Sequence, residues 1–157
     1  MSTLENFPYD ELTIGQTASF TKTLTDEDIQ LFAAASGDVN PVHLDDEFAA
    51  TTQFGGRIAH GMWTGALISA GIALTLPGPG SIYLGQSLTF RKPVFLGDTI
   101  TISLEVTEKL DDKQFVTLDC KATNQDGKAV AYGTAQVLAP SEKMVIEKPA
   151  APKVSIG

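Results

Sequence analysis

The sequence is poor in cysteine, in basic residues and in long hydrophobic runs. Its only cysteine, Cys120, excludes an internal disulfide and a cysteine-based zinc site, and its place in an alternating apolar run predicts a buried side chain. Eleven basic residues stand against nineteen acidic ones, which gives a net charge of −8. Because nucleic acids are bound through clustered lysines and arginines, this balance argues against a nucleic-acid partner.

The longest mostly apolar stretch, residues 61–76, is shorter than the ~20 residues that a membrane-spanning helix needs. The first fifteen residues lack the basic-then-apolar pattern of a secretory signal peptide. We therefore expect a cytoplasmic protein that does not enter a membrane. A polyanionic ligand would depend on a few local cations, for which Lys22, Arg57, Arg91 and Lys92 are the candidates.

The length and composition are those of one globular domain. Hydrophobic residues make up 43% of the chain and charged residues 19%, and 157 residues are too few for two ordinary domains. We expect the domain to span residues 1–139. A proline-containing tail, residues 140–157, is expected to be mobile, with Met144–Ile146 as an alternative short strand.

Capping residues predict three helices in the first half of the chain. Thr25 opens a capping box, and its helix should end near Gly37. Asp45 caps a second short helix that we expect to end at Gly55–Gly56. The third and longest helix starts near Gly61 and is rich in small residues, which lets it lie close to a sheet. We place these residues on one side of it: Met62, Ala66, Ser69, Ala70 and Ala73.

Beyond Ser81 the apolar residues alternate with a period of two, which predicts strands. The turn-forming segments Leu110–Lys113 and Asn124–Gly127 suggest that the last three strands are antiparallel neighbours. A further short strand is expected around residues 13–20. One long helix against an antiparallel sheet makes an α+β domain. The alternating runs are Ile82–Phe90, Ile100–Val106, Val116–Ala122 and Lys128–Leu138, with Val130, Tyr132, Thr134 and Leu138 sharing one face of the last.

Asp38 and His43 are the first candidates for chemistry. Pro41 has a fixed φ and biases Asn40 toward extended backbone, so we expect a structured loop here and not a helical turn. A carboxylate and an imidazole that converge on one water can act as general acid and base, each step contributing about 10²–10⁴-fold. The alternative is an ordinary turn, in which Asp38 caps backbone N–H groups and His43 bonds locally.

His60 and Gly61 mark a second candidate position, at the start of the long helix. The exposed N–H of Gly61, together with the positive end of the helix dipole, can bind a carbonyl oxygen that gains negative charge. The absence of a side chain permits close approach, although glycine also occurs at helix starts for structural reasons. We interpret His60 as a structural histidine.

Taken together, four segments resemble the MaoC-like (R)-specific enoyl-CoA hydratases of the hotdog-fold superfamily, and the resemblance extends from about residue 13 to 138. The segments are DVNPVHLD (38–45), FGGRIAHG (54–61), GSIYLGQSLTF (80–90) and PVFLGD (93–98). The resemblance implies a long helix wrapped by a curved antiparallel sheet, usually in a homodimer. It implies no metal and no cofactor, since coenzyme A is part of the acyl-CoA substrate.

The same resemblance implies a role for each matching residue. Asp38 and His43 would hold the water, with either as the base, and the Gly61 N–H would bind the thioester oxygen. Asn40 would support the pocket, and Ser69 would place a hydroxyl near it from the inward face of the long helix. Ile72, one turn beyond Ser69, would close the pocket and limit the enzyme to short acyl chains.

The implied reaction is the reversible syn hydration of trans-2-enoyl-CoA to (3R)-3-hydroxyacyl-CoA, with crotonyl-CoA as a typical short substrate. Two alternatives stay open: a hotdog acyl-CoA thioesterase, which directs water to the thioester carbon, and a non-catalytic acyl-CoA-binding subunit. The spacing of Asp38 and His43 favours hydration. An acyl-carrier-protein thioester is not distinguished from acyl-CoA, nor is the pathway determined.

Overall fold

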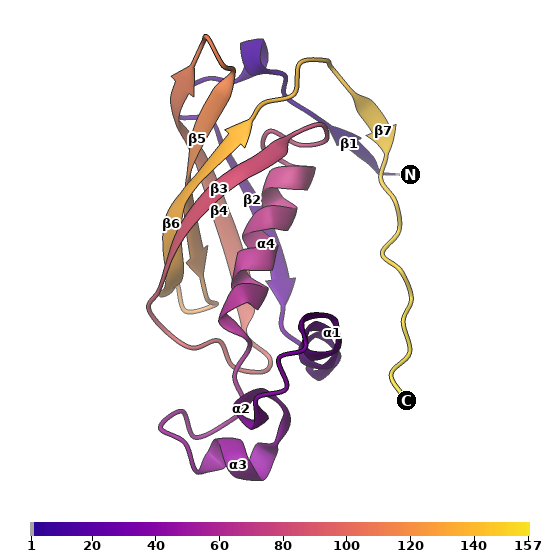
Figure 1. The fold of residues 1–157 in the computed structure, drawn as a ribbon, viewed down its shortest axis with the longest axis vertical. Helices are drawn as coiled ribbons and strands as arrows, with labels where there is room; N and C mark the ends of the chain where they lie inside the picture. The colour runs from indigo at the N-terminus through magenta and orange to yellow at the C-terminus, as the bar shows by residue number, and fades with distance from the viewer. Residues whose placement is uncertain (1) are drawn as a thin grey trace.

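A five-stranded antiparallel sheet curves around one long helix in the computed structural model, which describes residues 2–157 (Figure 1). The strand order is β2-β4-β5-β6-β3, and the helix is α4 (Gly61–Leu74). The predicted α+β class is therefore confirmed. The strands are β2 (Thr17–Thr23), β3 (Ile82–Phe90), β4 (Thr99–Leu110), β5 (Phe115–Thr123) and β6 (Ala129–Leu138).

Strands β4, β5 and β6 are consecutive antiparallel neighbours, as the turn residues predicted. Cys120 on β5 is fully buried, and burial raises the pKa of its thiol to about 11. The thiol therefore stays protonated at neutral pH and acts as a small hydrophobe, as predicted.

The predicted face of β6 is wrong. Tyr132 and Thr134 are exposed, whereas Ala135 and Val137 are buried against the core. Val130 is also buried, but it lines a cavity at the end of the sheet. Val130 is therefore apolar because it lines the cavity. Counting it as part of the core face places the predicted face of β6 one residue out of step with the buried one.

Helix α4 is packed against the sheet through one face, which includes Trp63, Ile68 and Ile72. Gly71 lets the sheet approach closely, since a Cβ there would lie 3.3 Å from Leu104 Cδ1. The sequence predicts an inward-facing Ser69. It is only half-buried and shares its side of α4 with exposed Met62, Ala66 and Ala73. Because α4 is apolar all round, periodicity alone did not identify its buried side.

Helix α1 (Asp26–Ser36) has the predicted capping box at Thr25 and ends at Gly37, whose φ of 82° is left-handed. The next segment corrects a prediction, because Pro41–Leu44 forms the short helix α2 and not a loop. Asn40 adopts the extended backbone that the proline favours, but it does so as the N-cap, and Pro41 takes the first helical position.

Asp45 caps the short helix α3 (Asp46–Ala50), as predicted. The helix ends at Ala50, before the expected Gly55–Gly56. The hydroxyls of Thr51 and Thr52 donate to the carbonyls of Phe48 and Ala49, so these side chains supply hydrogen bonds at the helix end.

Two short strands, one near each end of the chain, form a second sheet (Figure 1). Strand β1 (Thr3–Glu5) pairs with β7 (Val145–Glu147), so the alternative of a short strand near Met144–Ile146 is correct. Buried Asn6 supports this pair: its amide donates to the carbonyls of Pro79 and Glu142. A 3-10 turn, η1 (Tyr9–Glu11), leads into the domain. No helix among residues 2–157 combines the length and apolar character needed to cross a membrane.

Candidate active site

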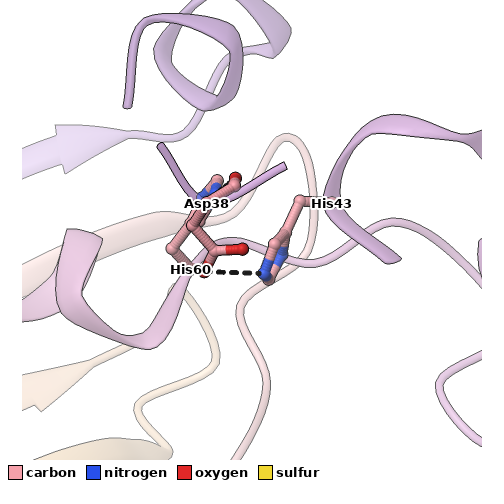
Figure 2. Close-up of side chains that lie close together, drawn as sticks. All are labelled: Asp38, His43 and His60. Atoms are coloured by element: carbon pink, nitrogen blue, oxygen red, sulfur yellow. Dashed lines mark hydrogen bonds and ion pairs between the residues drawn. The ribbon is translucent and has the colours of Figure 1, made fainter. Parts of the chain in front are cut away.

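The loop between α1 and α2 holds the Asp38 carboxylate in a fixed orientation. Its Oδ1 accepts the Asn40 N–H at 3.1 Å, and the Asp38 N–H donates to Ser36 Oγ at 3.1 Å. The other oxygen, Oδ2, lies 3.9 Å from His43 Nε2 (Figure 2). The backbone thus engages one carboxylate oxygen and leaves the second facing the imidazole.

His43 is the third residue of α2, and its ring is buried. Ring atom Nδ1 lies 2.8 Å from the Ile58 carbonyl oxygen. A carbonyl only accepts, so Nδ1 carries the proton and, in the neutral ring, Nε2 has a free lone pair. Because 3.9 Å is too long for a direct hydrogen bond, an oxygen atom about 2.8 Å from each group can lie between Asp38 and His43.

Gly61 begins α4 and lines the same cavity as His43. Its N–H belongs to the first turn, where no intrahelical acceptor exists and the helix dipole favours negative charge. A Cβ at this position would lie 3.2 Å from two ring carbons of Phe90, which also lines the cavity. Glycine therefore keeps the N–H accessible without displacing the Phe90 ring.

The cavity has a volume of about 320 Å³. Thr64 and Val130, only 2% and 1% exposed, are its most buried lining residues, whereas Phe90, Arg91 and Lys92 are exposed and mark its mouth.

The structure brings together some of the predicted site residues and separates others. His43 and Gly61 line the cavity, and Asp38 adjoins it through His43. Asn40 caps α2, which carries His43. Neither Ser69 nor Ile72 lines the cavity: Ser69 is half-buried two turns beyond Gly61, and Ile72 is buried in the core.

Thr64, Phe90 and Val130 are among the lining residues that were missed from the sequence. Thr64 follows Gly61 by one helical turn, so helical spacing could have identified it. Phe90 and Val130 reach the site only because β3 pairs with β6, which brings Phe90 opposite Ala131. No local sequence pattern specifies such a long-range register.

Arg57 stabilises the segment that carries His43. Its Nε–H donates to the His43 carbonyl at 2.7 Å, its Nη2 pairs with Asp26, and its Nη1 lies 3.9 Å from Asp46. One buried guanidinium thereby joins α1, α2 and α3. Two of its donors are engaged, and the carboxylates of Asp26 and Asp46 balance its charge, which leaves it poorly suited to hold a phosphate.

The other three candidate cations differ in their surroundings. Lys22 pairs with Asp28 at 3.4 Å, away from the cavity. Arg91 and Lys92 line the mouth, and neither forms an ion pair with any residue of the described chain. Arg91 also lies over the Tyr132 ring, 6.0 Å from its centroid. Arg91 and Lys92 are therefore the cations available to an anion at the mouth.

Asp38, His43 and His60 bring their ligand atoms within 4.8 Å of one another. The two imidazoles are stacked, with centroids 3.8 Å apart and planes at 25°. A metal ion lies about 2.0–2.1 Å from each imidazole nitrogen and in the plane of the ring. Two nearly parallel rings at this separation do not meet that requirement, so the arrangement suits proton transfer better than metal binding.

Comparisons with known proteins agree with this geometry. Residues 11–126 match the family described as MaoC like domain. An (R)-specific enoyl-CoA hydratase from Rhodospirillum rubrum is 45% identical over 133 residues, which cover 85% of this chain and 92% of that protein. A 3-hydroxybutyryl-CoA dehydratase from Methylorubrum extorquens is 40% identical over 135 residues, covering 86% and 85%. The structure of R-hydratase PhaJ1 from Pseudomonas aeruginosa, in the unliganded form, matches with a TM-score of 0.95 at 55% identity, covering 99% and 100%.

Proposed function

The chain belongs to the MaoC-like domain family, and from this we propose that it is an (R)-specific enoyl-CoA hydratase, a hydro-lyase that adds water reversibly to trans-2-enoyl-CoA. The match to the PhaJ1 structure also confirms the hotdog fold. The product is a (3R)-3-hydroxyacyl-CoA, and the reverse reaction is the dehydration named for the Methylorubrum relative.

The observation that carries the proposal is the spacing of Asp38 and His43 beside the Gly61 N–H. The 3.9 Å gap between carboxylate and imidazole accommodates one water oxygen, and His43 and Gly61 line one cavity. Syn hydration needs a proton acceptor and a proton donor on the same face of the double bond, together with a donor to the thioester oxygen. These three residues supply those groups.

The reaction follows from this placement. The bound water gives a proton to one member of the pair as its oxygen bonds to C3. Electrons of the C2–C3 double bond move toward the thioester carbonyl, whose oxygen gains negative charge and accepts the Gly61 N–H bond. C2 then takes a proton from the other member of the pair, which must enter the reaction protonated, so the pair gains one proton and loses one.

The two alternatives require different chemistry of the same residues. Thioester hydrolysis sends the water to the carbonyl carbon and has no need of a proton donor facing C2. A binding subunit has no need of a paired carboxylate and imidazole. The 3.9 Å spacing of two titratable groups, which accommodates one water, favours hydration over both.

Loss of either member of the pair should abolish most of the activity. We expect Asp38→Asn and His43→Asn to lower kcat with crotonyl-CoA by about 10²–10⁴-fold, because each removes one proton-transfer group. The measurement is loss of enoyl absorbance, with product stereochemistry and free thiol assayed in parallel. Release of thiol by the wild type would indicate a thioesterase, and tight binding without turnover would indicate a binding subunit.

The length of the acyl chain that the enzyme accepts is expected to depend on Val130, the most buried residue that lines the cavity. Val130→Ala removes two methyl groups there and should raise kcat/KM for six- and eight-carbon enoyl-CoA relative to crotonyl-CoA. Ile72→Ala is the matched control, because it truncates a core residue outside the cavity and should cost about 2–5 kcal/mol of stability without changing selectivity. If Ile72→Ala and not Val130→Ala changed the chain-length selectivity, Ile72 would close the pocket as the sequence predicts.

Arg91 and Lys92 are proposed to bind the phosphates of coenzyme A. Each exposed pairing contributes about 1 kcal/mol, so Arg91→Gln and Lys92→Gln should each raise KM for crotonyl-CoA about fivefold with kcat unchanged. Lys22→Gln removes a cation that is paired with Asp28 elsewhere, and it should leave KM unchanged. Equal KM values in all three variants would contradict phosphate binding at the mouth.

We also propose a homodimer, formed through the edge strand β3. Ile82, Leu84 and Phe90 are 54%, 44% and 49% exposed on this strand, and the outer edge of β3 pairs with no strand of the described chain. Sedimentation equilibrium should give twice the chain mass of 16.7 kDa. Leu84→Lys places a charge in the proposed interface and should lower the measured mass toward that of the monomer. A monomeric wild type at micromolar concentration would contradict this assembly.

A further inference from the structure

His60 occupies a position that the proposed reaction does not yet use. Its ring is only 3% exposed and lies between two other rings: Phe32, with centroids 4.9 Å apart, and His43, with centroids 3.8 Å apart. His60 is also the N-cap of α4, so its main chain leads directly into Gly61. One residue therefore adjoins both halves of the site.

The hydrogen bonding of His60 limits what its ring can do. Its Nε2 lies 2.9 Å from the backbone oxygen of Asp38, and because a carbonyl only accepts, Nε2 carries the proton. The other nitrogen, Nδ1, is buried and has no hydrogen-bond partner in the described chain. Leaving a buried polar atom unpaired costs stability, so a purely structural position would be better filled by an apolar ring.

We propose that His60 is a positioning residue, which sets the placement of the Asp38–His43 pair relative to the Gly61 N–H. The ring holds the main chain of Asp38 through its Nε2–H and supports the face of His43 by stacking (Figure 2). Its own main chain fixes where α4 begins. The inference rests on the proposed hydratase function and assigns this residue no proton transfer.

Two substitutions separate the two contacts of the ring. His60→Gln retains an N–H donor in reach of the Asp38 carbonyl but loses the stacking, whereas His60→Phe retains the stacking and loses the donor. His60→Ala removes both. The matched control is Ile29→Val in α1, a buried residue outside the site, whose loss of stability should leave kcat unchanged.

Displacing a catalytic group by about 1 Å costs on the order of 10²-fold in rate. We expect His60→Ala to lower kcat with crotonyl-CoA by about 100-fold, and the Gln and Phe variants to retain part of the lost rate. His60 also lines the cavity, but the proposal gives it a role in placing the catalytic groups and not in binding, so KM should stay within about twofold of wild type. Wild-type kcat in all folded variants, or a raised KM with unchanged kcat, would overturn the proposal.

Crystal structures of wild type and the three variants give a readout that does not depend on turnover. The Asp38 Oδ2 to His43 Nε2 distance should depart from 3.9 Å in the variants. Unchanged positions of Asp38, His43 and Gly61 would overturn the positioning role even if activity fell. If the wild type hydrates no enoyl-CoA, the proposed function fails, and the structural comparison still decides whether His60 fixes this geometry.

Discussion

The proposed chemistry of this protein depends on one spacing, the 3.9 Å between the Asp38 carboxylate and the His43 imidazole. A shorter distance would let the two groups bond directly and exclude a water, and a much longer one would leave the water held by one group alone. The spacing cannot arise from the two side chains themselves, because a facing carboxylate and imidazole attract one another. It has to be imposed by the backbone that carries them. The Asx turn at Asp38, the cap at Asn40 and the bond from His43 to Ile58 serve that purpose.

The hotdog scaffold supplies the second half of the site through the placement of α4. The segment before the helix is tied to the connection between β3 and β4, since Ile58 bridges Phe95 and the Ala59 N–H donates to the Val94 carbonyl. The same segment contacts the loop that carries the catalytic pair. The helix start is thus fixed between the sheet and the loop. The packing of α4 against the sheet therefore also places the N–H of Gly61 at the cavity.

Features determined by neighbouring residues could be predicted from the sequence. The caps at Thr25 and Asp45, the start of α4 at Gly61 and the two hairpin turns depend on local chemistry, and they were correct. Errors arose where one local signal fits two structures or where burial depends on distant residues. Pro41 is compatible with a loop and with a first helical position. The buried side of α4 is set by packing and cannot be read from a helix that is apolar on all sides. The buried face of β6 is also set by packing, and Val130 obscures it because this apolar residue lines the cavity. The register of β3 against β6, which completes the cavity, has no local signal.

The loop that carries the chemistry is held largely through its main chain. Arg57 bonds the carbonyl of residue 43, and His60 bonds the carbonyl of residue 38, whatever side chains those positions carry. These two contacts would therefore remain if the side chain of Asp38 or His43 were replaced and the catalytic pair lost. During evolution, a duplicated copy could lose its carboxylate or its imidazole and still fold around an acyl-sized cavity.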